Sequence, residues 1–364
     1  MSSGVRSSIF IFLLLMSAGG AVMLHAEEPS QAKAGEPVSE KARKTWETAL
    51  DWQKKGFPNI AIDELREANQ QDGGHCTECL RRAYELALAS GASKDATEVA
   101  REWLTAASTD ADKAAIHARL GEALVLQGIT YKKKQFFAQS VDEYKTALAL
   151  DPHRTLTHMG YGVALAQMRQ DGAALAEFRA FLDTDKEHPA LHWRAERYIE
   201  QIDLAREPLA PEFKLTTMDG KQMSRDGLAG KVVLIDFWAS WRAPCRASIP
   251  TIANLVKEFD GRPFVVISVN LDKDEDAWKS MVRRYGMTWP EAGDGGFNGP
   301  TAQMFAVRAI PATFTIDADG ILQDQRVGDT NLEAKLKKMV AQAEKIGAGR
   351  GASAAAVKAS GVGK

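Results

Sequence analysis

Hydrophobic residues between positions 46 and 204 recur with the three- and four-residue spacing of amphipathic helices. The region is rich in Ala, Leu, Glu, Gln, Lys and Arg, and prolines interrupt it only at Pro58, Pro152 and Pro189. We therefore expect an all-helical domain, which we bound at residues 41–206.

A repeat runs through this helical region. Its unit is a set of three residues, separated by four and then three positions, that begins with a small residue. One such set returns 34 residues later: Ser140, Tyr144 and Ala147, then Ala174, Phe178 and Phe181. The same spacing occurs earlier: Ala61, Leu65 and Ala68, then Ala96, Ala100 and Trp103. The period resembles that of tetratricopeptide (TPR) repeats, although residues 128–137 interrupt it as an insertion. This resemblance implies stacked helix pairs with a groove for a peptide or partner protein. A helical bundle with accidental periodicity is the alternative.

Beyond Pro208 and Pro211 the pattern changes to alternating strands and helices. Continuous apolar runs at residues 232–235 and 264–267 are typical of central strands covered on both faces, and we expect those strands at residues 232–238 and 264–270. We expect further strands at residues 213–217, 313–316 and 322–327. Helices are expected at residues 245–259, 275–285, 301–305 and 332–343. The sequence thus predicts an α/β domain over residues 207–345, preceded by the helical one.

The composition agrees with two soluble domains. A chain of 364 residues exceeds one ordinary core, and 45% hydrophobic with 26% charged residues is typical of globular proteins. The net charge of −2 gives no indication of a nucleic-acid surface. Nothing in the composition calls for a cofactor, and three cysteines are too few for disulfides to provide most of the stability.

Residues 1–26 have the pattern of a secretory signal peptide. Arg6 precedes an apolar run, and Ala26 suits the position before a cleavage site. The apolar run is shorter than the roughly 20 residues that span a bilayer, so we expect cleavage and export to the periplasm or cell envelope. An uncleaved anchor is the alternative, and it is the only membrane contact we expect. Residues 27–40 are predicted to be a linker, and residues 346–364 a disordered tail.

The most informative stretch follows the first apolar strand. Trp241, Arg242, Ala243, Pro244 and Cys245 occupy the turn between this strand and a predicted helix. A C-x-x-C at such a helix start is a redox motif, but here Arg242 stands where the first cysteine would be.

Several motifs in order resemble the thioredoxin-like fold, and within it the exported TlpA/ResA-like redoxins. They are the hairpin around Asp219-Gly220, the strand and turn at residues 232–241, the Ile310-Pro311 loop and the turn at residues 317–321. The resemblance covers residues 208–343, somewhat over a third of the chain. It implies an α/β thioredoxin-like domain and a role in disulfide handling in the cell envelope.

The resemblance also implies roles for single residues. Asp236 matches a buried acid that assists proton transfer to the second cysteine, and burial raises the pKa of such a carboxyl. Pro311 matches a cis-proline that leaves the backbone groups of Ile310 open to a bound peptide. We therefore expect substrate contacts from Trp241, Arg242, Pro244, Ile310 and Pro311. Asp236 and Cys245 are the catalytic candidates.

Arg242 departs from the family pattern. Disulfide exchange needs a thiolate to attack and a second thiol to resolve the mixed disulfide, and arginine cannot attack sulfur. Cys245 has two open interpretations. The helix dipole and Arg242 activate its thiol, or burial leaves it an inert core residue.

Cys76 and Cys79 form a true C-x-x-C, but in the helical domain. A structural disulfide, a redox-active pair and a metal site are the three alternatives. The metal site lacks ligands, since His75 and two thiolates fall short of the four that zinc usually takes.

Two functions follow as hypotheses. In the first, a redoxin with altered or lost catalysis holds a client or partner protein through its TPR-like groove and thioredoxin surface. In the second, a thiol-disulfide oxidoreductase works through Cys245 alone or together with the Cys76/Cys79 pair.

Overall fold

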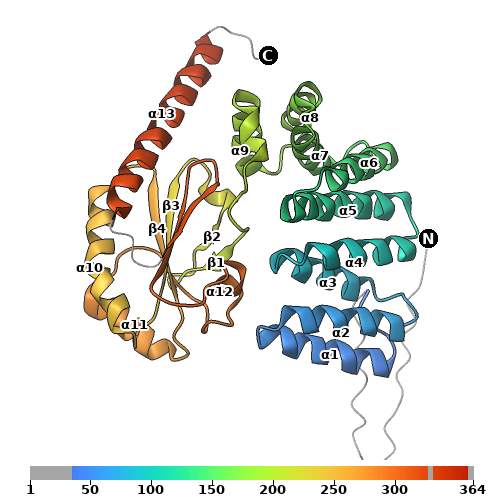
Figure 1. The fold of residues 1–364 in the computed structure, drawn as a ribbon, viewed down its shortest axis with the longest axis horizontal. Coiled ribbons are helices and arrows are strands. Elements are labelled where there is room, and N and C mark those ends of the chain that lie inside the picture. Colours follow the sequence, from blue (N-terminus) through green and yellow to red (C-terminus); the bar gives the residue numbers. More distant parts are fainter. Residues whose placement is uncertain (1–34, 327–330, 360–364) are drawn as a thin grey trace, which may run out of the picture.

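The computed structural model describes residues 35–326 and 331–359. The signal peptide predicted at residues 1–26, most of the predicted linker, and residues 360–364 of the predicted tail lie outside these ranges. Within them the chain forms a stack of helices beside an α/β domain, as predicted (Figure 1). No helix of the described part is long and apolar enough to cross a membrane.

The helical array consists of α1 to α9, and each helix packs against the next. Their bounds are α1 Glu40–Lys54, α2 Pro58–Gln71, α3 Thr77–Ala89, α4 Ser93–Ala106, α5 Asp110–Tyr131, α6 Lys134–Leu150, α7 Thr155–Gln167, α8 Asp171–Thr184 and α9 Pro189–Glu200. The insertion at residues 128–137 forms the end of α5, its C-cap Lys132 in the left-handed conformation, and the first turn of α6. A short 3-10 turn, η1 (Ile202–Arg206), leads out of the array.

Close helix pairing in the array depends on glycine facing an aromatic ring. A Cβ on Gly121 of α5 would lie 2.9 Å from the ring of Tyr144 on α6. A Cβ on Gly162 of α7 would lie 2.4 Å from the ring of Phe178 on α8. Both rings are buried, as the repeated spacing of small and large residues predicted. The packing is consistent with stacked helix pairs.

The α/β domain is built on a five-stranded sheet of order β5-β4-β3-β6-β7. Its strands are β3 Val232–Trp238, β4 Phe264–Asn270, β5 Glu291–Gly293, β6 Ala312–Ile316 and β7 Leu322–Arg326. A hairpin of β1 (Lys214–Thr216) and β2 (Gln222–Ser224) precedes it, followed by the 3-10 turn η2 (Asp226–Leu228). The pairs β3–β4 and β4–β5 are parallel, whereas β6 runs antiparallel to both of its neighbours.

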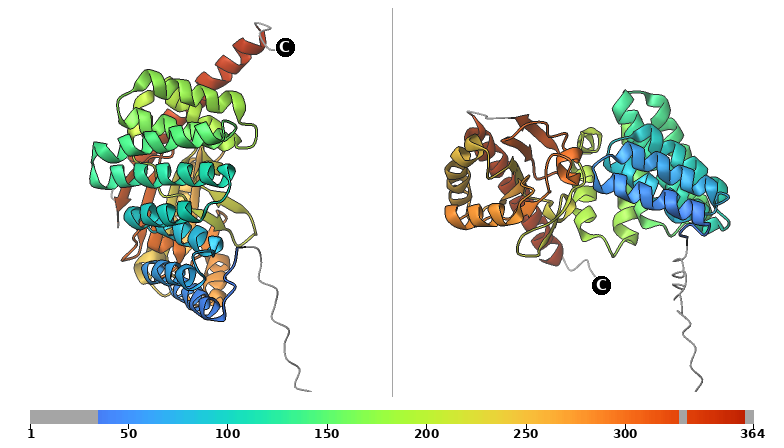
Figure 2. Two further views of the ribbon diagram at one scale, coloured as in Figure 1. Left: turned by 90° about the vertical axis from the view of Figure 1, so that its right-hand side faces the viewer. Right: turned by 90° about the horizontal axis from the view of Figure 1, so that it is seen from below.

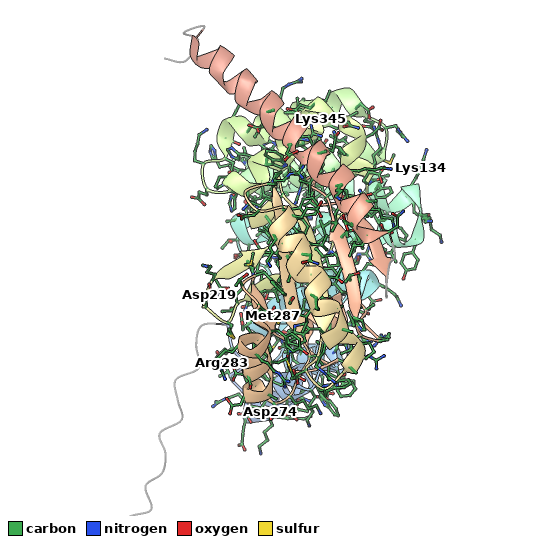
Figure 3. The ribbon with its side chains drawn as sticks, turned by 90° about the vertical axis from the view of Figure 1, so that its left-hand side faces the viewer. Lys134, Asp219, Asp274, Arg283, Met287 and Lys345 are labelled. Carbon is green, nitrogen blue, oxygen red and sulfur yellow. A yellow bond between two sulfur atoms is a disulfide. The ribbon has the colours of Figure 1, made fainter. Side chains whose placement is uncertain are left out.

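Four helices belong to this domain: α10 Ala243–Glu258, α11 Glu275–Tyr285, α12 Pro300–Met304 and α13 Leu332–Ala359. Helices α10, α11 and α13 form the outer layer, away from the array, and Figure 3 views them with Arg283 of α11 and Lys345 of α13 labelled. Since α10 and α11 connect parallel strands in one direction along the sheet, right-handed crossovers place both on one face. Helix α12 lies on the side that faces the array (Figure 1).

Two expectations need correction. The strand β5 was not predicted, because its three residues carry no β-branched or aromatic side chain. The segment after Ile346 was predicted to be disordered, whereas α13 continues to Ala359. Alanines and the absence of proline let the helix continue there. In addition, the described end of the predicted linker is packed: Glu78 donates its N–H to the carbonyl of Gly35.

The array and the α/β domain lie side by side and contact each other at both ends of the array (Figure 2). At one end, Arg194 of α9 pairs with Asp226, and Arg197 Nε donates to Asp319 Oδ1 at 2.8 Å. At the other end, a Cβ on Gly56, between α1 and α2, would lie 2.5 Å from the carbonyl oxygen of Asn298. The two domains keep separate hydrophobic cores.

Candidate functional site

The turn after β3 presents the candidate site. Ser240 is buried and its N–H donates to the carboxylate of Asp272 at 3.0 Å, while Arg246 Nη1 donates to the Ser240 carbonyl at 2.8 Å. These bonds fix the turn, and the next residue, Trp241, is 59% exposed. A large apolar side chain held in water beside a rigid turn is suited to contact a bound chain.

Arg242 is the N-cap residue of α10, and Pro244 follows in its first turn. This is the place where the helix dipole would stabilise a thiolate. The guanidinium is half-buried, and its Nε has no hydrogen-bond partner among the described residues. The position that carries the attacking sulfur in a C-x-x-C motif therefore holds a fixed positive charge.

Cys245 lies one turn further into α10 and is completely buried. Burial raises the pKa of its thiol; a backbone hydrogen bond from Ala239 lowers it, the charge of Asp236 raises it, and Arg242 lowers it. The net direction is upward, so the thiol is protonated at neutral pH. Of the two interpretations of Cys245, the buried core cysteine is the one this environment favours.

Asp236 lies on β3 beneath the turn. Its side chain is buried, and desolvation raises the pKa of its carboxyl to about 7. A carboxyl with this pKa exchanges its proton near neutrality, which is what a proton acceptor for a neighbouring thiol requires.

The loop before β6 is the remaining part of the candidate site. The peptide bond between Ile310 and Pro311 is cis, as the resemblance implied. Ile310 is buried as a whole residue, with 1% of its surface exposed, and no hydrogen bond joins its backbone N–H or C=O to another backbone group of the described residues. These backbone groups can pair with an extended peptide only when the residue becomes accessible.

The sequence reasoning missed one acidic residue near the site. Glu291 of β5 is buried, and its Oε2 accepts a hydrogen bond of 3.2 Å from Trp238 Nε1. Burial raises its pKa well above the usual value, the charge of Asp236 raises it further, and the indole bond opposes both. The only signal in the sequence was a carboxylate directly after Trp289-Pro290, which is too common a pattern to single out.

Cys76 and Cys79 are far from this turn in the sequence and are joined to each other, with a Sγ–Sγ distance of 1.95 Å. Both are completely buried at the start of α3, against Ala68 and Trp46. A disulfide leaves neither sulfur as a thiolate ligand. Across the described residues there is no group of three or more His, Cys, Asp and Glu side chains that could hold a metal ion.

Comparisons with known proteins agree with this geometry. The redoxin family model matches residues 205–343. The thiol-disulfide oxidoreductase ResA of Bacillus thuringiensis (strain Al Hakam) is 31% identical over 143 residues, which cover 38% of this chain and 80% of that protein. The thioredoxin-like protein YneN of Bacillus subtilis is 34% identical over 123 residues, covering 33% and 69%.

A solved structure is also similar to part of the chain. It is a putative thiol:disulfide interchange protein DsbE from Chlorobium tepidum, with 29% identity and a TM-score of 0.34. The match covers 38% of this chain and 96% of that one. By its C-terminal α/β domain, this chain belongs to the redoxin family, among the relatives of the thiol-disulfide oxidoreductase ResA.

Proposed function

We propose that this chain is an exported redoxin of cell-envelope thiol-disulfide metabolism that binds a protein or peptide without completing the two-cysteine exchange reaction. One observation carries the proposal. At the start of α10 a guanidinium occupies the attacking position, and the remaining thiol of Cys245 is buried and protonated.

The chemistry of disulfide exchange supports this conclusion. The reaction begins when a thiolate attacks one sulfur of the substrate disulfide, and a second thiol then releases the mixed disulfide. Arg242 supplies neither step. Cys245 lacks both the exposure and the ionisation that an attacking thiol needs.

The recognition surface remains in place despite the missing sulfur. Trp241 is exposed, and the buried Ile310 makes no backbone–backbone hydrogen bond to the described residues before the cis-Pro311. An extended client segment would pair with the Ile310 backbone and cover the Trp241 ring. The TPR-like array would hold a larger part of the same partner. The leader predicted at residues 1–26 supports an envelope location for this function.

Export also suits the disulfide in α3. In an oxidising compartment a buried pair such as Cys76–Cys79 remains closed, and we assign it a structural role.

A disulfide-reduction assay on the full chain tests the proposal. Wild type should reduce insulin no faster than the Cys245→Ser variant. Arg242→Cys should gain turnover, because Pro244, Cys245 and the cis-Pro311 loop are all present. The double variant Arg242→Cys/Cys245→Ser is the matched control and should lose that gain.

Wild-type turnover that disappears in Cys245→Ser would overturn the proposal and establish the alternative, an oxidoreductase working through Cys245. Replacing Cys76 and Cys79 by serine in the same assay would then decide whether the second pair takes part.

A further inference from the structure

Three polar side chains form a row across the sheet beneath the redoxin turn. The strand register places Asp236 of β3 opposite Ser268 of β4, and Ser268 opposite Glu291 of β5. Paired residues on parallel neighbouring strands project to the same face, and such strands are about 4.8 Å apart. All three side chains are buried, so two carboxyl groups share one desolvated layer of the domain.

Two indole groups donate hydrogen bonds into this row. Trp238 Nε1 donates to Glu291 Oε2, and Trp289 Nε1 donates to Ser268 Oγ at 2.7 Å. Neither carboxylate takes part in an ion pair within the described residues. Asp236 Oδ1 and Glu291 Oε1 are both buried without a hydrogen-bond partner there.

The charged and titratable groups around the row come from two further places. Cys245 and Arg242 belong to α10 and its N-cap, and Asp272 follows β4; these act on the thiol of Cys245 together with Asp236. The charge that acts on Glu291 is that of Asp236. Among the described residues, no positive group pairs with Glu291 to offset a second negative charge there.

Electrostatics limits such a pair to one charge near neutrality. Burying an unpaired carboxylate is costly, and a second like charge in the same layer adds repulsion that water does not screen. The two groups then lose their protons in two steps that belong to the pair.

We propose that Glu291 and Asp236 form a buried acid pair that retains one proton at neutral pH. Glu291 holds this proton, so the single negative charge resides on Asp236, next to Cys245. Glu291 is thus a positioning residue, which fixes the ionisation of Asp236 without touching the thiol. The directions of the two pKa values agree with this order. Burial raises both, and the charge of Asp236 raises the pKa of Glu291 further.

The pair also provides the group that accepts the proton of Cys245. When the thiol of Cys245 ionises, its S–H bond breaks and an O–H bond forms on Asp236. The layer then holds two neutral acids beside a thiolate. This step rests on the proposed function and deepens it, because a charged Asp236 explains why the thiol of Cys245 stays protonated. The acid pair itself does not depend on whether the protein turns over a disulfide.

Carboxyl ¹³C NMR of the full chain, labelled at Asp and Glu, tests the pair directly. Asp236→Asn and Glu291→Gln assign the two resonances, and Glu47→Gln is a matched control at an exposed glutamate of α1. In wild type, Asp236 should titrate first, near pH 7, and Glu291 at higher pH. In Asp236→Asn the Glu291 titration should move down by about one pH unit or more, because the repelling charge is gone.

The pH profile of Cys245 alkylation is a second readout, and it reports the charge on Asp236. Asp236→Asn should shift this profile to lower pH, whereas Glu47→Gln should leave it unchanged.

A Glu291 resonance that titrates near pH 4.5 in wild type would overturn the proposal, as would a titration that Asp236→Asn leaves in place. The wild-type titration decides even if a variant fails to fold. Turnover of wild type in the insulin assay would overturn the proposed function and leave the acid pair standing, so the two failures are distinguishable.

Discussion

The stability of the redoxin domain in the Asp236→Asn variant, relative to wild type, should increase as the pH rises. Asp236 is buried with a pKa raised to about 7 by desolvation. In the unfolded chain the same carboxyl ionises near its ordinary value of 3.8. Between these two values the unfolded state releases a proton that the folded state retains, so the wild type loses stability as the pH rises.

The magnitude follows from the shift of the pKa. A rise from 3.8 to about 7 corresponds to roughly three units, and at about 1.36 kcal/mol each this is ~4 kcal/mol. The loss begins near pH 4 and is complete just above pH 7. Asparagine carries no proton to release, so the advantage of the variant should be small near pH 4 and ~4 kcal/mol at pH 8. A buried amide without partners costs about 1–3 kcal/mol at every pH, which offsets the curve without changing its slope.

Urea unfolding of the full chain, followed by labelling of Cys245, measures the effect. Cys76 and Cys79 are in a disulfide, so labelling reports on Cys245 and hence on the redoxin domain. Asp63→Asn, at an exposed position of α2, is the matched control and should show no such slope. A stability difference between Asp236→Asn and wild type that is the same at pH 5 and pH 8 would refute the reasoning.

Three further predictions concern the array and its contacts. Replacing Cys76 and Cys79 by serine should lower the stability of the array by about 2 kcal/mol, since the closed loop is short, as measured by far-UV circular dichroism during urea unfolding. Gly56→Val should loosen the contact with Asn298, because φ is +79° and a Cβ would lie 2.5 Å from the Asn298 carbonyl; faster hydrogen exchange in that loop would show it. Arg197→Ala should cost about 2 kcal/mol and speed proteolysis at residues 207–211, because it removes the ion pair to the β6–β7 turn; unchanged cleavage would contradict this.

The sequence predicted the parts of the fold whose signals are local. The strands β3 and β4 begin with their continuous apolar runs and occupy the predicted residues, as α11 does. The helix α10 begins two residues earlier than predicted, since Ala243 and Pro244 suit a first turn. Short strands such as β5 are different. Three residues, Glu-Ala-Gly, become a strand only because β4 offers a parallel edge, and that edge is a tertiary feature.

The same limit applies to the candidate site. Arg242, Cys245 and Asp236 were found because the turn and its strand are contiguous in the sequence. Glu291 was missed because it reaches the site through the register of a strand that could not be predicted. The contact between Gly56 and Asn298 joins residues from two domains, and no periodicity or motif encodes such a pair.

The arrangement at α10 indicates that an arginine in place of the first cysteine would change the chemistry more than the fold. The N-cap position combines the helix dipole with contact to solvent, so a cysteine there is both ionised and reachable. Cys245, one turn deeper, has neither property, and Asp236 below it adds a negative charge that opposes a thiolate. A guanidinium at the N-cap cannot replace the missing attack, yet Trp241 and the backbone of Ile310 do not depend on the lost sulfur. A redoxin altered in this way would keep its means of binding an extended segment while losing the step that releases it as a dithiol. We therefore expect Arg242→Cys to change turnover far more than binding.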